Sequence, residues 1–361
     1  MKYYIYEGKF SDIDKYNASS KARTDVEKIL VSIGYKRLIV ETESGVQKNK
    51  LLKGKQFMQY VKNRRIWDKA LGNLKKNDEI VIQYPLRNTT INFDKILKKY
   101  NKKIKIILVI HDLESLRLMP TISKIQTIRV KFEDAKILKS CNKIISHNKK
   151  MSEQLVKKGI DKSKIVDLEI FDYLFDGEIK HKNRTKNMPI IIAGNLSSAK
   201  AEYLKELKEI QNLKFNLYGK NLDFSLNENK NIFYKGAFLP EELINNLEGS
   251  FGLVWDGNAI ETCGGPLGNY LKYNNPHKTS LYLVAGIPVI VWKQSAMASF
   301  VEENKIGLCV DNLHEIGDRI NNLTNDDYNK MCYNAEMISK KLKMGFYLKR
   351  SFEKNKALRE V

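Results

Sequence analysis

The feature that most constrains the fold of this 361-residue chain is a repeated alternation of short apolar, β-branched runs with longer amphipathic stretches. Such runs predict strands that are covered on both faces, and the stretches between them predict the covering helices. In the first half, strands are expected at 2–8, 37–41, 79–85, 105–112, 143–147 and 164–168, and helices at 21–33, 56–74, 92–99, 122–140 and 150–158. This order predicts a parallel, doubly wound α/β sheet.

The alternation fails once and then starts again. The segment 175–188 is polar, charged and without a period, so it is expected to be a linker. Beyond it, strands are expected at 189–194, 215–218, 232–235, 252–255, 288–292 and 307–310, and helices at 199–210, 240–247, 278–285, 295–303 and 324–341. The predicted architecture is two Rossmann-like doubly wound domains, 1–178 and 186–344, that face a central cleft.

The chain carries a formal net charge of +21, from 63 Lys and Arg against 42 Asp and Glu. Such a surplus fits nucleic acid, an anionic membrane face or an acidic substrate. Lysines accompany abundant Asn and Ile along the whole chain, so part of the surplus is compositional. No helix-turn-helix, zinc-finger, RNP or KH motif is present, and aromatic residues do not interleave with the basic clusters. We therefore expect no nucleic-acid partner and favour peripheral association with an anionic membrane.

The expected compartment is the cytoplasm, including the inner face of the cell membrane. No apolar run approaches the roughly 18 to 20 residues of a membrane span, and the chain starts directly in a strand. Cys141, Cys263, Cys309 and Cys332 lie far apart without CxxC spacing, which is typical of reduced thiols.

The segment 273–292 has the pattern of a polar loop, a short helix, a glycine turn and a buried strand. Pro276 is expected at the first helical position, and Gly286 ends the helix. The free backbone N–H groups and the positive dipole end of such a helix, together with Lys278, favour a phosphate. The alternative is the ordinary helix–strand unit of any α/β protein.

Ligands of doubly wound sheets bind beyond the carboxyl ends of the strands, so the residues that follow each strand are candidates. In the second domain these are 193–200, 218–220, 235–238, and 255–257 with the long loop to Lys278; the candidates within them are Gly194, Asn195, Lys200, Tyr218, Gly219, Lys220 and Lys278. Glycines let the backbone approach a ligand, and lysines can neutralise a diphosphate. Each glycine alone fits a tight turn, and it is their coincidence on one edge that indicates a site.

In the first domain, an unbroken apolar strand ends in His111-Asp112, which places two proton-transfer groups at the cleft. The alternative is that Asp112 caps the next helix and His111 bonds nearby groups. Ser19 and Ser20 precede a helix, and either cap it or face an acceptor; capping is favoured. Asp12-Ile-Asp14 lies in the first loop and is expected to be solvated, so no metal site is predicted.

Several chemistries lack their motifs. The sequence has no GxGxxG after a strand and no GxxxxGK[ST], which argues against dinucleotide oxidoreductases and P-loop nucleotidases. It also has no GxSxG elbow and no HxxxH pair, so hydrolase triads and zinc sites are not supported.

A series of segments in the second half resembles bacterial GT-B sugar transferases. The nearest groups are the β-1,6-galactofuranosyltransferases of surface polysaccharide synthesis and the glucosyltransferases that extend glycans on serine-rich-repeat adhesins. The segments are Gly194-Asn195-Leu196, Tyr218-Gly219, Lys235-Gly236, 270–278, 285–291 and 295–301, with Asn274-Asn275-Pro276-His277-Lys278 the most specific. The resemblance implies a nucleotide-sugar site in the second domain, an acceptor site in the first, and a helix at 345–361 that crosses back onto the first domain.

By the same resemblance, the enzyme transfers a hexosyl unit, galactofuranose or glucose, from a UDP-sugar to a hydroxyl of a lipid-linked or protein-linked glycan, without a cofactor or metal. Asp112, His111 and Lys278 are the expected catalytic residues, and Ser19 and Ser20 the acceptor contacts. The implied donor contacts are Gly194, Asn195, Lys200, Tyr218, Gly219, Lys220, Asn274, Asn275, Pro276, His277 and Ser280.

One position departs from the wider fold family. Retaining GT-B relatives hold the ribose with the glutamate of a P-x-K-x-x-E-Y pattern, whereas this chain has Leu281 there, so Ser280 or a backbone group is expected to replace it. A homo-oligomer is expected. Two alternatives stay open: a non-catalytic partner subunit of another glycosyltransferase, and a periplasmic-type binding protein, which the lysine-rich cleft disfavours.

Overall fold

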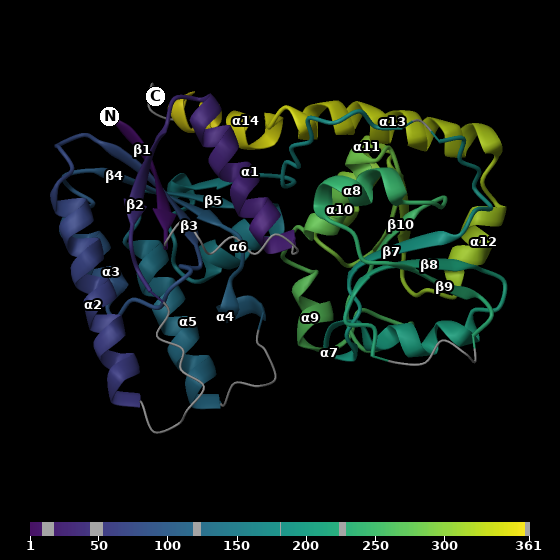
Figure 1. Ribbon diagram of the computed structural model, residues 1–361, viewed down its shortest axis with the longest axis horizontal. Coiled ribbons are helices and arrows are strands. Elements are labelled where there is room, and N and C mark those ends of the chain that lie inside the picture. Colours follow the sequence, from purple (N-terminus) through teal and green to yellow (C-terminus); the bar gives the residue numbers. More distant parts are fainter. Residues whose placement is uncertain (9–17, 44–52, 118–123, 181, 224–228, 358–361) are drawn as a thin grey trace.

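The computed structural model describes residues 1–361 except 9–17, 44–52, 118–123, 181, 224–228 and 358–361. Its chain forms two parallel six-stranded sheets with helices on both faces, side by side in Figure 1. This confirms the predicted pair of doubly wound α/β units, because apolar runs buried on both faces need helices on both sides.

The first sheet has the strand order β2-β1-β3-β4-β5-β6. Its strands are β1 (Lys2–Glu7), β2 (Lys36–Val40), β3 (Glu79–Tyr84), β4 (Lys105–Ile110), β5 (Lys143–Ser146) and β6 (Ile165–Asp167). Its helices are α1 (Ala18–Ser32), α2 (Lys53–Gly72), α3 (Phe93–Tyr100), α4 (Glu114–Arg117), α5 (Lys124–Lys139) and α6 (Lys149–Lys157), followed by a 3₁₀ turn, η2 (Lys162–Lys164).

The second sheet has the order β12-β11-β10-β7-β8-β9. Its strands are β7 (Ile190–Asn195), β8 (Phe215–Lys220), β9 (Ile232–Gly236), β10 (Gly252–Val254), β11 (Val289–Trp292) and β12 (Gly307–Val310). Its helices are α7 (Ser198–Ala201), η3 (Glu202–Glu209), α8 (Pro240–Asn246), α9 (Gly265–Tyr270), α10 (His277–Val284), α11 (Ala298–Asn304), α12 (Glu315–Asn321) and α13 (Asn325–Lys343).

One helix differs in kind from its prediction. The single helix expected at 199–210 is a short α-helix, α7, followed by the 3₁₀ helix η3. Ala201 forms a β-bridge with Gly257, and the amide of Tyr203 donates to the Gly257 carbonyl, so the backbone leaves the α-helical ladder at this point. Helices α9 and α12 were not predicted.

Two chain crossings join the halves. The first is the segment after β6, in which Phe171 and Tyr173 are buried in a hydrophobic cluster that also contains residues of β1, β7 and α10. The second is α14 (Phe346–Ala357), which continues from α13 and packs against α1 and β6 (Figure 1).

Asp172, in the first crossing, forms hydrogen bonds with the second crossing. Its carboxylate accepts hydrogen bonds from the amides of Tyr347 (3.1 Å) and Leu348 (2.7 Å), in the first turn of α14. These amides have no partner within the helix, so the side chain satisfies groups that would otherwise be orphaned. Burial raises the pKa of Asp172 to about 7, although the two amide bonds act in the opposite direction.

This pKa predicts a pH-dependent stability. The pKa of Asp172 is about 7 in the folded chain, and about 4 in an unfolded one. Between these values the folded state holds more protons, so the contribution of this group to the free energy of unfolding is lost as the pH rises. In urea unfolding, the wild type should have a higher free energy of unfolding than Asp172→Asn at pH 5, and this difference should be smaller at pH 8. The exposed Asp176, in the same segment, supplies the control Asp176→Asn. An advantage that stays constant or grows would contradict the prediction.

Candidate active site

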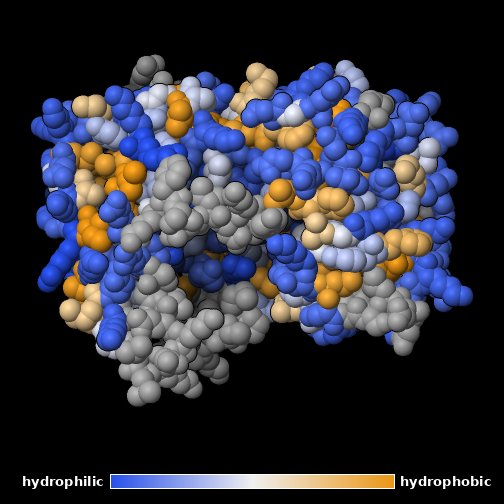
Figure 2. All heavy atoms as spheres, viewed as in Figure 1, coloured by the Kyte–Doolittle hydropathy of each residue, from blue (hydrophilic) through white to orange (hydrophobic). Residues whose placement is uncertain are grey.

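The strand order of the second sheet reverses between β7 and β10, where the early strands of this half run to one side and the late strands to the other. In open α/β sheets, such a switch point opens a crevice beyond the carboxyl ends of the strands. Gly194 and Asn195 end β7 here, and Trp255-Asp256 follows β10. Figure 2 shows a hollow between the two halves with a hydrophilic floor.

Lys278 reaches this crevice from the first turn of α10. Its Nζ atom donates to Asp256 Oδ1 at 2.8 Å and to the carbonyl of Trp255 at 2.9 Å. Burial lowers the pKa of Lys278, Asp256 raises it, and the charge of Lys200 lowers it again. The predicted cation therefore lies at the switch point, with a carboxylate partner that sequence reasoning missed.

Strands β7 and β8 each carry a glycine at the carboxyl end. Gly194 and Gly219 are paired in register, and a Cβ atom on Gly219 would lie 1.7 Å from the Gly194 carbonyl oxygen. A Cβ atom on Gly194 would meet no atom within 4 Å, so this backbone faces open space. Asn195 and Lys220 are exposed at the same edge. These four residues lie where the prediction placed them.

Lys200 connects the two sides of the crevice electrostatically. It lies in α7, directly beyond the end of β7, and its side chain is half-buried. Its charge lowers the pKa of Lys278 in the second half and also that of Asp112 in the first. A cation in this place can attract an anion bound between the halves.

Several buried polar atoms without a hydrogen-bond partner lie in the segment 274–295. Within the described part of the chain they include Asn274 Oδ1, His277 Nε2, Thr279 Oγ1, Trp292 Nε1 and Ser295 Oγ. Native proteins leave few such atoms, so a run of them in one segment suggests a site completed by a ligand or by water. Thr279 and Ser295 were not predicted as site residues.

Asn275 has another role than the predicted donor contact. Its backbone N–H donates to His147 Nδ1 at 2.9 Å, and its side-chain Nδ2 donates to the backbone carbonyls of His147 (2.6 Å) and Glu169 (3.1 Å). These bonds join the loop before α10 to the ends of β5 and β6. Asn275 therefore belongs to the contact surface between the two halves, which we call the seam.

Ser280 belongs to the same seam. Its hydroxyl is fully buried and donates to the carbonyl of Phe171 at 2.6 Å, so it does not face the crevice where a ribose would lie. Leu281, next in the chain, is buried in the hydrophobic cluster shared by the halves. The sequence could not show this, because the contact depends on how the halves meet.

Pro276 and His277 stand at the start of α10. Pro276 is the N-cap rather than the first helical residue. The ring of His277 stacks on Tyr173, with 5.0 Å between ring centroids, and burial lowers the pKa of His277 to about 3. The ring is therefore neutral near pH 7 and packs between the halves.

Tyr218 does not point into the crevice. Its side chain is buried beside Phe238, and its hydroxyl accepts a hydrogen bond from the amide of Glu248 at 3.0 Å. Side chains alternate between the faces of a strand, and this one faces the core under α8. The predicted donor contact is corrected to a packing role for the side chain.

His111 and Asp112 follow β4 in the first half, as expected. The His111 Nε2 atom bonds with Gln83 Oε1 at 2.7 Å, and its ring stacks on Phe171 at 5.4 Å between centroids. Burial lowers the pKa of His111 well below its usual range, and the charge of Arg23 adds to this. His111 is thus a neutral ring held in place by its neighbours.

Asp112 is the more open of the two. Its carboxylate lies 3.8 Å from the Arg117 guanidinium, and its side chain is 37% exposed. Burial raises the pKa of Asp112, while Arg117 and Lys200 oppose the rise. A carboxylate with this exposure and a raised pKa can accept a proton from a bound hydroxyl group.

Tyr270 closes the crevice near Asp112. This residue of α9 accepts a hydrogen bond from the amide of Leu113 at 2.9 Å, and so joins the second half to the first. It was part of the resembling segment but was not predicted as a site residue. Ser19 and Ser20 lie in the first turn of α1 rather than before it, and their side chains are outside the described residues, as are Asp12 and Asp14.

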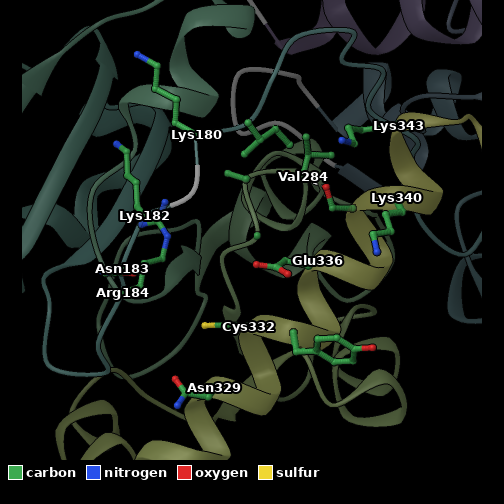
Figure 3. A pocket seen from close by; sticks show the side chains of 15 residues that line it. Lys180, Lys182, Asn183, Arg184, Val284, Asn329, Cys332, Glu336, Lys340 and Lys343 are labelled. Atoms are coloured by element: carbon green, nitrogen blue, oxygen red, sulfur yellow. Dashed lines mark hydrogen bonds between the residues drawn. The ribbon is translucent and has the colours of Figure 1, made fainter.

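A separate cavity of about 600 Å³ lies between residues 179–180 and 182–184 on one side and α13 on the other (Figure 3). Ala285 and Gly286 line it and precede β11, so it opens at the opposite edge of the sheet from the crevice. The side chains of Lys180 and Lys182 point away from α13, so these cations do not converge on one ligand.

The sequence matches the two domain models of one family, one in each half of the chain. Residues 2–170 match the glucosyltransferase 3-like N-terminal domain, and residues 190–355 match the corresponding C-terminal domain. The chain is 35% identical to the β-1,6-galactofuranosyltransferase WbbI of Escherichia coli (strain K12), over 77% of this chain and 79% of that protein. It is 25% identical to glucosyltransferase 3 of Streptococcus parasanguinis, over 90% and 89% of the two chains.

Solved structures share the fold at low identity. The lipopolysaccharide outer core galactosyltransferase WaaB superposes with a TM-score of 0.60 at 13% identity over 100% of both chains. Sucrose-phosphate synthase from Thermosynechococcus elongatus gives 0.60 at 11% identity, over 99% of this chain and 98% of that one. The two sheets, the crossings and these likenesses show the GT-B fold.

The two domain models of this family match consecutive parts of the chain, and the 35% identity to WbbI extends over more than three quarters of each sequence. The chain therefore belongs to the glucosyltransferase 3-like family and is a glycosyltransferase.

Proposed function

We propose that this chain transfers a hexosyl unit, galactofuranose or glucose, from a UDP-sugar to a hydroxyl of a lipid-linked or protein-linked glycan. The names of the two relatives support this choice of sugars. The observation that carries the proposal is the placement of Lys278, held by Asp256 at the switch point of the second sheet, with the charge of Lys200 acting on both Lys278 and Asp112 of the first half. Donor phosphate and acceptor hydroxyl would lie between these two groups.

The leaving diphosphate gains negative charge as the glycosidic bond breaks. Fixed cations and helix N-termini stabilise such charge more in the transition state than before it. Lys278, Lys220 and Lys200 supply the cations, and the first turn of α10 supplies backbone amides. With this set, the transfer proceeds without a metal.

Asp112 is the proposed base. In an inverting reaction it accepts the proton of the acceptor hydroxyl while that oxygen attacks the anomeric carbon from the face opposite the diphosphate. The neutral ring of His111 supports the loop that carries Asp112. Attachment to anionic membranes and self-association stay predictions. Among the described residues, no helix has both the length and the apolar character needed to cross a bilayer.

The donor is tested with UDP-galactofuranose, UDP-glucose, UDP-galactose and UDP-N-acetylglucosamine, with UDP release and thermal shift as readouts. We expect one of the first two sugars to give the largest release, and the release to continue in EDTA because the protein supplies the cations. Loss of activity in EDTA with recovery by Mg²⁺ or Mn²⁺ would remove the metal-free mechanism, and no release from any donor would remove the proposed function.

Replacing Lys278 should slow the transfer strongly. Lys278→Ala is expected to lose at least about 2 kcal/mol of transition-state stabilisation, a factor of about 30 in kcat/KM, because a fixed cation at the leaving group is gone. Lys293→Ala is the matched control, since Lys293 follows the neighbouring strand β11 but forms an exposed pair with Asp311 at 3.2 Å. Equal kcat/KM values for the two variants would remove Lys278 from the mechanism.

Replacing Asp112 should remove the base. Asp112→Asn is expected to lower kcat by about 10² or more, because proton acceptance at the acceptor oxygen is lost. Glu114→Gln is the control: this carboxylate also lies near Arg117, at 3.4 Å, but is not the proposed base. A fully active Asp112→Asn enzyme, or a product that retains the anomeric configuration of the donor, would contradict the assignment.

A further inference from the structure

The Asp256 carboxylate is buried, and the backbone that carries it is closely packed. It follows β10 directly, and its side chain is 10% exposed. The next residue, Gly257, has φ of +118°, and a Cβ atom there would lie 2.4 Å from the carbonyl oxygen of Gly264. A Cβ atom on Gly268 of α9 would lie 2.8 Å from the carbonyl oxygen of Asp256. The tight packing of these glycines fixes the backbone from which the carboxylate projects.

The groups around Lys278 shift its pKa in opposite directions. Burial opposes the positive charge, and so does Lys200, in α7. Asp256, after β10, favours the charge, and so does the more distant Cys263. Asp256 is the only one of these groups in hydrogen-bond contact with the ammonium among the contacts of the described residues, at 2.8 Å.

The hydrogen-bond geometry also sets the direction of the ammonium group. A lysine ammonium has three donors. Asp256 and the carbonyl of Trp255 accept two of them. One donor is left for a ligand in the crevice, and the two protein bonds determine where it points.

We propose that Asp256 is a positioning residue for the transfer reaction: it keeps Lys278 charged and directs its remaining N–H toward the leaving diphosphate. Asp256 acts through Lys278 and does not touch the sugar. This inference rests on the proposed function, because it assigns a task to a residue beside the donor site.

The test compares the pH dependence of kcat in the wild type and in Asp256→Asn. The amide keeps an oxygen acceptor but removes the charge that favours the protonated lysine, so the alkaline limb of kcat should move to lower pH by about one unit or more. Asp311→Asn, which breaks the exposed Lys293–Asp311 pair at the neighbouring strand ends, should leave the limb in place. Asp256→Glu should keep the wild-type limb but lower kcat, since the longer side chain holds the ammonium elsewhere. An unchanged limb in Asp256→Asn would overturn the proposal.

A second measurement does not need turnover. NMR titration of lysine labelled at the ε-carbon, with the Lys278 signal assigned by its loss in Lys278→Arg, gives the pKa of Lys278 directly. It should fall in folded Asp256→Asn, with circular dichroism as the check of folding. If the asparagine variant does not fold, the titration of Asp256→Glu decides, where a pKa far below that of the wild type overturns the proposal. If no donor is used by the wild type, the proposed function fails while this titration still decides the role of Asp256.

Discussion

The crevice depends on the buried contact between Asp172 and the first turn of α14. The chain passes between the halves once after β6 and once through α14, and this carboxylate binds the second crossing to the first. A GT-B site exists only where the carboxyl ends of two sheets are held opposite each other. Because the two crossings are tied together, each half limits how the other can turn.

The loop before α10 and the first turn of that helix contribute to both the proposed site and the seam. Lys278 points to the crevice, while Asn275 and Ser280 bond to the first half on either side of it. Tyr270 adds a contact from α9. A change in the position of Lys278, the proposed donor cation, is therefore expected to change the packing between the halves, and the reverse is expected as well. These contacts come from four residues of one short stretch, 270–280.

The fold could be predicted because it follows from local patterns. Apolar runs bounded by polar segments gave the strands, and the break at 175–188 separated the halves. Lys278 and Asp112 could be proposed as site residues because both follow signals read along the chain. The pairing of Asp256 with Lys278 could not be predicted, because it depends on the distance from β10 to α10. Strand order sets this distance, and strand order is a property of the whole sheet. Tyr218 was misassigned because a strand buried on both faces gives no sequence signal for the direction of a side chain.

The pairing of Lys278 with Asp256 has a consequence for the empty enzyme. An unpaired ammonium in a crevice would collect the simple anions that are plentiful in a cell, such as chloride and inorganic phosphate. Here the nearest positive charge is already balanced by a carboxylate at 2.8 Å, so a monovalent anion gains little by binding. A ligand with several charges that also contacts Lys200, Lys220 and the backbone of α10 gains much more. At the proposed donor site, this built-in counter-ion would therefore favour a polyvalent diphosphate over simple anions.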